Sequence, residues 1–239
     1  LPTGSWRRVK ARAAREGLTP SVVLLAAFAV ALGRWARHPR FSINVTMINR
    51  QPVHPDAERL VGEFASFDLL PVDLTAGDGV LEVARSMQEQ AWADLEHRTV
   101  SGVQILRELA RVRGGTSGAS MPVVFTSTLV QDTGETGATL IDWLGDIEHE
   151  SVQTPQVWLD AAVLETSAGL YVSWPAVGAL FRPGVLDDMF AAYRRVLDLL
   201  AEGDAWDSGP DLLPAAHADV VAAANDTDGP RPAGPEAPQ

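Results

Sequence analysis

Three hydroxyl side chains end an otherwise apolar run between Pro122 and Leu129. They are Thr126, Ser127 and Thr128, and they follow Val-Val-Phe. Side chains alternate between the two faces of a strand, so Thr126 and Thr128 would share one face while Ser127 points to the other. Such hydroxyls can orient a reacting group, although composition alone favours a strand end that turns into solvent.

A carboxylate, Asp160, lies in an apolar stretch further along the chain. Alternation over residues 156–165 predicts a strand that places Gln156, Trp158 and Asp160 on one face. A carboxylate among apolar neighbours must find a hydrogen-bond partner or raise its pKa. A raised pKa would suit a general acid or base at neutral pH. The alternative is a carboxylate that caps nearby backbone N–H groups.

The composition excludes several other kinds of chemistry. The chain has 239 residues and no cysteine, which excludes disulfides, thiolate metal sites and a cysteine nucleophile. Its five histidines are widely spaced, and it contains no GxSxG, GxGxxG or phosphate-loop motif. A conventional hydrolase, kinase or dehydrogenase therefore has no support in the sequence.

The distribution of charge along the chain indicates which classes of partner the protein can bind. A net charge of −12 disfavours broad attraction to nucleic acid or to anionic lipid. Residues 1–40 differ, because they contain eight basic side chains and one acid, Glu16. The simpler interpretation is a solvated helix face, and the functional one is a docking patch for an acidic protein. The apolar run 21–33 is shorter than the roughly 20 apolar residues that span a bilayer, so we expect a buried helix and no membrane partner.

The candidate residues must be positioned by helices and strands that are intermixed along the chain. Hydrophobic periodicity predicts helices over 5–15, 19–38, 79–95, 101–112 and 183–202, with a short Ala-rich helix after Pro214. Alternation predicts strands over 41–48, 67–72, 121–129, 156–165 and 169–174, and a short one over 138–144. The last long helix should bury Leu186, Phe190, Tyr193 and Leu197. Residues after about Gly229 should make few contacts, because Pro and Gly dominate there.

At the two stretches described first, the sequence resembles heterocyclization domains. These are relatives of condensation domains in nonribosomal peptide synthetases, and they make thiazoline and oxazoline rings. The two most specific motifs, residues 122–129 and 153–160, occur in order and at about the expected separation. Four further segments agree with the family pattern, namely 18–35, 41–50, 60–70 and 213–227. The chain differs from that pattern at Glu63, Ala65, Ala161 and Pro175.

The resemblance covers the second half of the family's domain. It implies an α/β fold, a chloramphenicol-acetyltransferase-like half in which a mixed sheet is packed with helices, and it implies the C-terminal lobe only. Position by position, it assigns Asp160, Thr126 and Asn44 to catalysis. It makes Gln156, Ser127 and Asn49 the supporting candidates. The implied chemistry is amide formation on Cys, Ser or Thr, followed by cyclodehydration to the ring.

The resemblance also implies partners. These are the N-terminal lobe of the same domain, an upstream donor and a downstream acceptor carrier protein, and an adjacent adenylation domain. Phosphopantetheine would arrive on the carrier proteins, with no metal and no directly bound cofactor, and the location would be cytoplasmic. We expect the lobe over residues 1–205 and a partly disordered linker over 206–239.

One alternative to catalysis remains, a noncatalytic condensation-like lobe that serves as a scaffold or a carrier-docking surface. In either case we expect the isolated chain not to close rings. One wall of the site would be missing, so Asp160, Thr126 and Asn44 should converge on an open, wet face.

Overall fold

The computed structural model describes residues 1–51, 53–77, 79–115, 120–129 and 154–226. Within them lies a five-stranded mixed sheet of order β2-β1-β3-β4-β5. β3 pairs in parallel with both β1 and β4, while β2 and β5 pair antiparallel at the two edges. The strands are β1 (Arg40–Ile48), β2 (Ala65–Asp73), β3 (Val123–Ser127), β4 (Leu159–Thr166) and β5 (Gly169–Ser173). A mixed sheet packed with helices confirms the predicted fold class.

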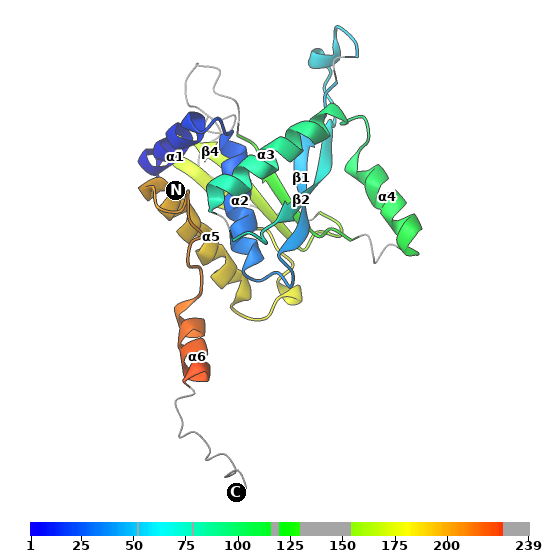
Figure 1. The fold of residues 1–239 in the computed structure, drawn as a ribbon. Coiled ribbons are helices and arrows are strands. Elements are labelled where there is room, and N and C mark those ends of the chain that lie inside the picture. Colours follow the sequence, from blue (N-terminus) through cyan, green and yellow to red (C-terminus); the bar gives the residue numbers. More distant parts are fainter. Residues whose placement is uncertain (52, 78, 116–119, 130–153, 227–239) are drawn as a thin grey trace, which may run out of the picture.

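Helices α1 (Thr3–Arg15), α2 (Pro20–Gly33), α3 (Val80–Glu96) and α5 (Val185–Glu202) gather on one face of the sheet (Figure 1). The central one is α2, which packs against α1, α3 and α5 and has buried side chains from Val22 to Ala29. Thr19 accepts a hydrogen bond from Val22 N and Pro20 begins the helix, as the sequence predicts. The helix ends at Gly33 instead of residue 38, because the next N–H groups bond back in a tighter turn.

The buried stripe of α5 differs in part from the predicted one. Tyr193 and Leu197 are buried, whereas Leu186 and Phe190 are only half-buried. The Phe190 ring packs edge-on against Trp174, with centroids 5.3 Å apart, on the rim of the core. The remaining buried positions are Met189, Ala192, Val196, Leu200 and Ala201.

Helix α4 (Gly102–Arg113) lies apart from the other helices, beside β2 (Figure 1). Ser101 and Gln104 form a capping box at its start, and Gly114 ends it with φ +73°. Both ends agree with the prediction. Gly102 allows α4 to touch β2 directly, because a Cβ there would lie 2.6 Å from the carbonyl oxygen of Phe67.

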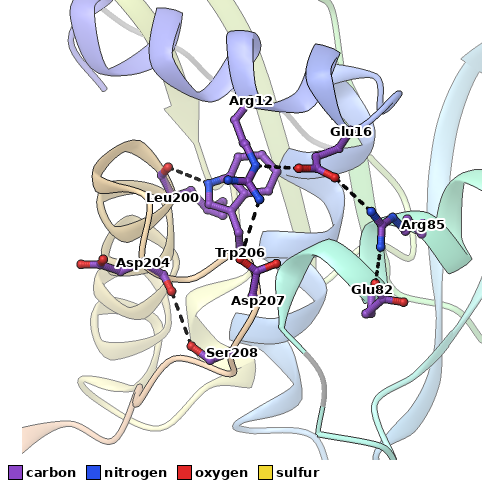
Figure 2. A network of polar contacts seen from close by, with 9 residues as sticks. All are labelled: Arg12, Glu16, Glu82, Arg85, Leu200, Asp204, Trp206, Asp207 and Ser208. Atoms are coloured by element: carbon purple, nitrogen blue, oxygen red, sulfur yellow. Dashed lines mark hydrogen bonds and ion pairs between the residues drawn. The ribbon is translucent and has the colours of Figure 1, made fainter.

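The segment after α5 folds back onto α1 and α3. Trp206 is fully buried, and its Nε1 donates to Leu200 O at 2.8 Å (Figure 2). The N–H groups of Val80 and Leu81 donate to the carbonyl oxygens of Ala205 and Trp206. These two carbonyls take the place of a side-chain cap at the start of α3.

Charged side chains surround this contact (Figure 2). The Arg12 guanidinium lies 5.6 Å from the centre of the Trp206 ring, and Arg12 pairs with Glu16 at 2.8 Å. Glu16 also pairs with Arg85 of α3 at 3.0 Å. On α1, Lys10 pairs with Glu165 of β4. Some of the basic side chains in residues 1–40 therefore form ion pairs within the chain.

The boundary expected at residue 205 stays a prediction, although Trp206, just beyond it, belongs to the core. Helix α6 (Ala215–Asn225) follows. The expected strand over 138–144 and the expected tail after Gly229 lie outside the described residues. Among the described helices, none has both the length and the apolar character to cross a membrane by itself. Helices α1 and α2 pass that test only as a pair, with a 103° bend between them.

Candidate functional site

Phe125 fixes which way each side chain of β3 points. Its side chain is buried on the helix-covered face, 5.8 Å from the Phe28 ring of α2. Thr126 therefore points to the opposite face of the sheet. In β4, Leu159, Ala161 and Val163 are buried while Asp160 between them is half-buried, so Asp160 shares the face of Thr126.

The strand register aligns the candidates in two rows across this face. Val124 pairs with Asn44 of β1 on one side and with Asp160 of β4 on the other. Asn44 and Asp160 are therefore two strands apart, about 10 Å between backbones. The next row contains Thr46 and Thr126, which continue the β1–β3 register.

A chain of hydrogen bonds connects these rows. Thr126 Oγ1 donates to Asp160 Oδ1 at 3.2 Å, and the Oγ1 atoms of Thr46 and Thr126 lie 3.1 Å apart. The backbone of Asp160 is held as well, because its N–H donates to Pro175 O at 2.9 Å. The structure thus brings together the two predicted residues Thr126 and Asp160. It adds Thr46, which the sequence analysis missed.

Asn44 is buried, with 8% of its surface exposed, and its Nδ2 donates to Met121 O at 2.6 Å. Its Oδ1 has no hydrogen-bond partner among the described residues. The next carbonyl along, Pro122 O, accepts from the N–H groups of Trp158 and Leu159. The expectation of an open, wet face is therefore wrong for Asn44, because it is buried against the segment that leads into β3. Thr126 and Asp160 are half-buried.

Gln156 does not lie on β4, so the predicted strand start is wrong. Residues Thr154–Val157 form a turn closed by a hydrogen bond from Val157 N to Thr154 O. Pro155 occupies the second position, and Gln156 has φ +66° at the third, which is the pattern of a type II turn. Thr154-Pro155-Gln156 is a local turn signal. The prediction instead followed the alternation of side chains from Gln156 onward, which is typical of a strand.

Ser127 and Asn49 also lie away from the Thr126–Asp160 pair. Ser127 points to the helix-covered face, where its Oγ lies 2.8 Å from Ser21 Oγ of α2. Asn49 follows the end of β1, and its Nδ2 donates to Arg98 O at 3.0 Å. The first contact joins β3 to α2, and the second joins the residue after β1 to a residue just after α3.

A cavity of about 930 Å³ opens on the same face, between β1, β3 and α4. Its volume is in the range of pockets that hold small organic ligands. Asn44 and Thr46 contribute polar groups, and Arg107 of α4 contributes a cation. The other described residues of the wall are mostly apolar and include Phe67, Val103, Leu106, Met121, Val124, Val157 and Trp158.

One pair of carboxyl groups lies outside this site. Asp68 of β2 points to the helix-covered face and meets Asp94 of α3. Burial and the negative charge of Asp94 raise the pKa of Asp68 to about 6. Within the described parts of the chain, no three His, Cys, Asp or Glu side chains gather closely enough to hold a metal ion.

Comparison with known proteins places this arrangement in a family. The family model described as condensation domain matches residues 4–217. Pyochelin synthetase PchF of Pseudomonas aeruginosa is 39% identical, over 93% of this chain and 13% of that protein. Phenyloxazoline synthase MbtB of Mycobacterium tuberculosis is 40% identical, over 90% of this chain and 15% of that protein. The chain thus spans a small part of the length of these relatives.

Solved structures agree. The cyclization-docking bidomain of the synthetase EpoB from Sorangium cellulosum is 41% identical, with a TM-score of 0.74, over 87% of this chain and 41% of that one. The nonribosomal peptide synthetase FmoA3 is 32% identical, with a TM-score of 0.83, over 97% of this chain and 26% of that one. The chain therefore belongs to the condensation-domain family, and a cyclization domain of a nonribosomal peptide synthetase is among the structures it resembles.

Proposed function

We propose that this chain is the C-lobe of a heterocyclization domain. It would contribute to amide bond formation and to cyclodehydration of carrier-bound Cys, Ser or Thr. The observation that carries the proposal is the hydrogen bond from Thr126 to Asp160, on the sheet face where the cavity opens. The printed names of the relatives support the same chemistry, since one is an oxazoline synthase and another a cyclization bidomain.

The cyclodehydration needs a group that takes and returns protons, and we assign this role to Asp160. The substrate's thiol or hydroxyl attacks the amide carbon, so a C–S or C–O bond forms, and its proton passes to Asp160. Asp160 returns that proton to the former carbonyl oxygen. Asp160 then takes the proton of the ring nitrogen and gives it to the same oxygen, which leaves as water while the C=N bond forms. The carboxylate is thereby regenerated. Thr126 holds the carboxylate in position throughout.

The remaining partners are part of the same proposal. An N-lobe would cover Asp160 and Thr126, which are only half-buried here, and so exclude water from the reacting groups. Donor and acceptor carrier proteins would deliver substrates on phosphopantetheine arms into the cavity. An adenylation domain would follow in the same cytoplasmic synthetase.

The test uses the intact domain, with both lobes and both loaded carrier proteins. Asp160→Ala should leave amide formation largely intact and slow ring closure by roughly 10²- to 10⁴-fold, the usual contribution of a general acid–base group. Uncyclised peptide should then accumulate on the carrier, and mass spectrometry distinguishes it from the ring by one water. Asp187→Ala, an exposed change at the start of α5, is the matched control.

Ring closure at the parent rate by Asp160→Ala would refute the assignment. A parent domain that forms neither the amide nor the ring, but still binds its carriers, would instead identify the lobe as a scaffold or docking surface.

A further inference from the structure

We propose that Thr46 relays protons between a substrate in the cavity and Asp160, through Thr126. The inference rests on the proposed function, because it concerns the same site. Thr46 lines the cavity and also contacts Thr126. Thr126 and Asp160 themselves are not among the described residues of the cavity wall. A molecule in the cavity would therefore meet the chain of hydroxyls at Thr46.

The chemistry of the three groups sets the direction of their hydrogen bonds. An ionised carboxylate only accepts, so Thr126 must use its single proton on Asp160 at 3.2 Å. The Thr126 oxygen then accepts from Thr46, 3.1 Å away. Thr46 is left with lone pairs that can accept a hydrogen bond from a group in the cavity. That group would be the thiol, the hydroxyl or the amide N–H of the substrate.

The same chain can move a proton without moving any heavy atom. When the substrate's nucleophile gives its proton to Thr46 Oγ1, Thr46 passes its own proton to Thr126, and Thr126 passes its own to Asp160. Each hydroxyl gains one proton and loses one, and the carboxylate becomes neutral. Reversing the three transfers delivers that proton to the former carbonyl oxygen. A second passage through the same groups carries the nitrogen's proton to this oxygen, which leaves as water, so the relay balances over the reaction.

The backbone holds Thr46 firmly enough for this role. It lies within β1, paired with Phe67 of β2 on one side and beside Thr126 on the other. A β-branched side chain in a strand has few χ1 rotamers, so its hydroxyl has few directions in which to point. Thr46 would therefore fix the orientation of the Thr126 hydroxyl as well as relay its proton.

The experiment compares three single variants in the intact domain with both loaded carriers. Thr46→Val removes the hydroxyl and keeps the shape, while Thr46→Ser keeps the hydroxyl. Thr166→Val is the matched control, since it removes a hydroxyl that bonds to Gly169 O at the far end of β4. For each variant, the rates of amide formation and of ring closure are measured in the same sample by mass spectrometry.

We expect Thr46→Val to slow ring closure about tenfold or more, with amide formation within about twofold of the parent. Thr46→Ser should restore most of the ring-closure rate, and Thr166→Val should match the parent. Amide formation in the same sample shows that the domain is folded. If Thr46→Ser is as slow as Thr46→Val, the role is one of shape, and the inference is wrong.

Asp160→Asn, measured in parallel, separates this inference from the proposed function. If Asp160→Asn loses ring closure while Thr46→Val keeps it, the relay is refuted and the assignment of Asp160 stands. If neither variant affects ring closure, both proposals fail. The double variant that combines Thr46→Val with Asp160→Asn should be no slower than Asp160→Asn alone. The two hydroxyls cannot relay a proton once the carboxylate that accepts it is absent.

Discussion

Asn44 Nδ2 lies 2.6 Å from the carbonyl oxygen of Met121, so a side chain of β1 holds the residue that leads into β3. The neighbouring carbonyl of Pro122 accepts from the N–H groups of Trp158 and Leu159, which precede Asp160. The buried amide of Asn44 is thus linked to Asp160 indirectly, through the backbone segments 121–122 and 158–160. This gives Asn44 a structural role that is separate from the catalytic role implied by the family resemblance.

The first prediction concerns this contact. Asn44→Ala should lower the free energy of unfolding by about 1–3 kcal/mol, since the Met121 carbonyl loses its buried partner. Loss of the unpartnered Oδ1 should offset part of this, which favours the lower end of the range. Asn49→Ala, which removes a more exposed bond to Arg98 O, should change stability by no more than about 0.5 kcal/mol. Urea unfolding followed by circular dichroism measures both, and equal effects would contradict the structural role.

The second prediction fills the cavity. Ala110 of α4 lines the cavity, so Ala110→Phe should lower turnover of the intact domain by about tenfold or more, because it displaces the substrate from the reacting groups. Val112→Phe, on the same helix at a side chain with 69% exposure, should leave turnover near the parent value. Both variants should unfold at similar urea concentrations. Normal turnover by Ala110→Phe would show that the substrate binds elsewhere.

The third prediction is a pH dependence. The pKa of Asp68 is about 6 in the folded chain, above its ordinary value of 3.8. Between these two pH values the folded state binds more protons than the unfolded state, so stability falls as pH rises from about 4 to about 6. Asp68→Asn should flatten this slope and make the domain more stable than the parent at neutral pH. Unfolding free energies measured across this range test the prediction.

Asp73→Asn is the matched control for the Asp68→Asn experiment. Hydrogen bonds from Thr75 lower the pKa of the exposed Asp73, so its contribution to stability is lost mainly as pH falls below the ordinary value of 3.8. It should therefore leave the slope between about pH 4 and 6 nearly unchanged. A slope that survives Asp68→Asn would mean that another group is responsible.

The fourth prediction concerns the end of the lobe. Trp206→Ala should destabilise the domain by about 3–5 kcal/mol, the usual cost of removing a fully buried tryptophan side chain. Trp92→Ala, at a side chain with 55% exposure, should cost about 0.5 kcal/mol or less. A chain that ends at residue 205 should likewise melt well below one that ends at residue 213. Equal melting temperatures would place the boundary of the lobe at 205, as the sequence suggested.

The sequence was informative where local pattern decides the structure. Thr19 and Pro20 mark the start of α2, and Ser101 with Gly114 marks both ends of α4. Alternation around Phe125 correctly set Thr126 and Ser127 on opposite faces. The pairing of Thr126 with Asp160 came from the family motifs, since it depends on two strands far apart in the chain.

Two of the failures, at Thr46 and Trp206, have one physical cause, which is that the deciding contact is not local. Thr46 meets Thr126 only because β1 and β3 are neighbours in the sheet, and strand order cannot be read from alternation. Trp206 falls in a segment rich in Gly, Asp and Ser, so its burial is decided by α1 and α3. Gln156 is the exception, because the local sequence Thr-Pro-Gln already indicates its turn.

The carbonyls of Ala205 and Trp206 have a consequence for how the chain folds during synthesis. The first N–H groups of α3 find their partners in residues that the ribosome adds only after β3, β4, β5 and α5. Until then this end of α3 has no cap and Trp206 is not yet present to fill the core. The lobe therefore acquires its full stability late, once its last turn has emerged, and a nascent chain paused before Ala205 should be the species most open to proteases and chaperones.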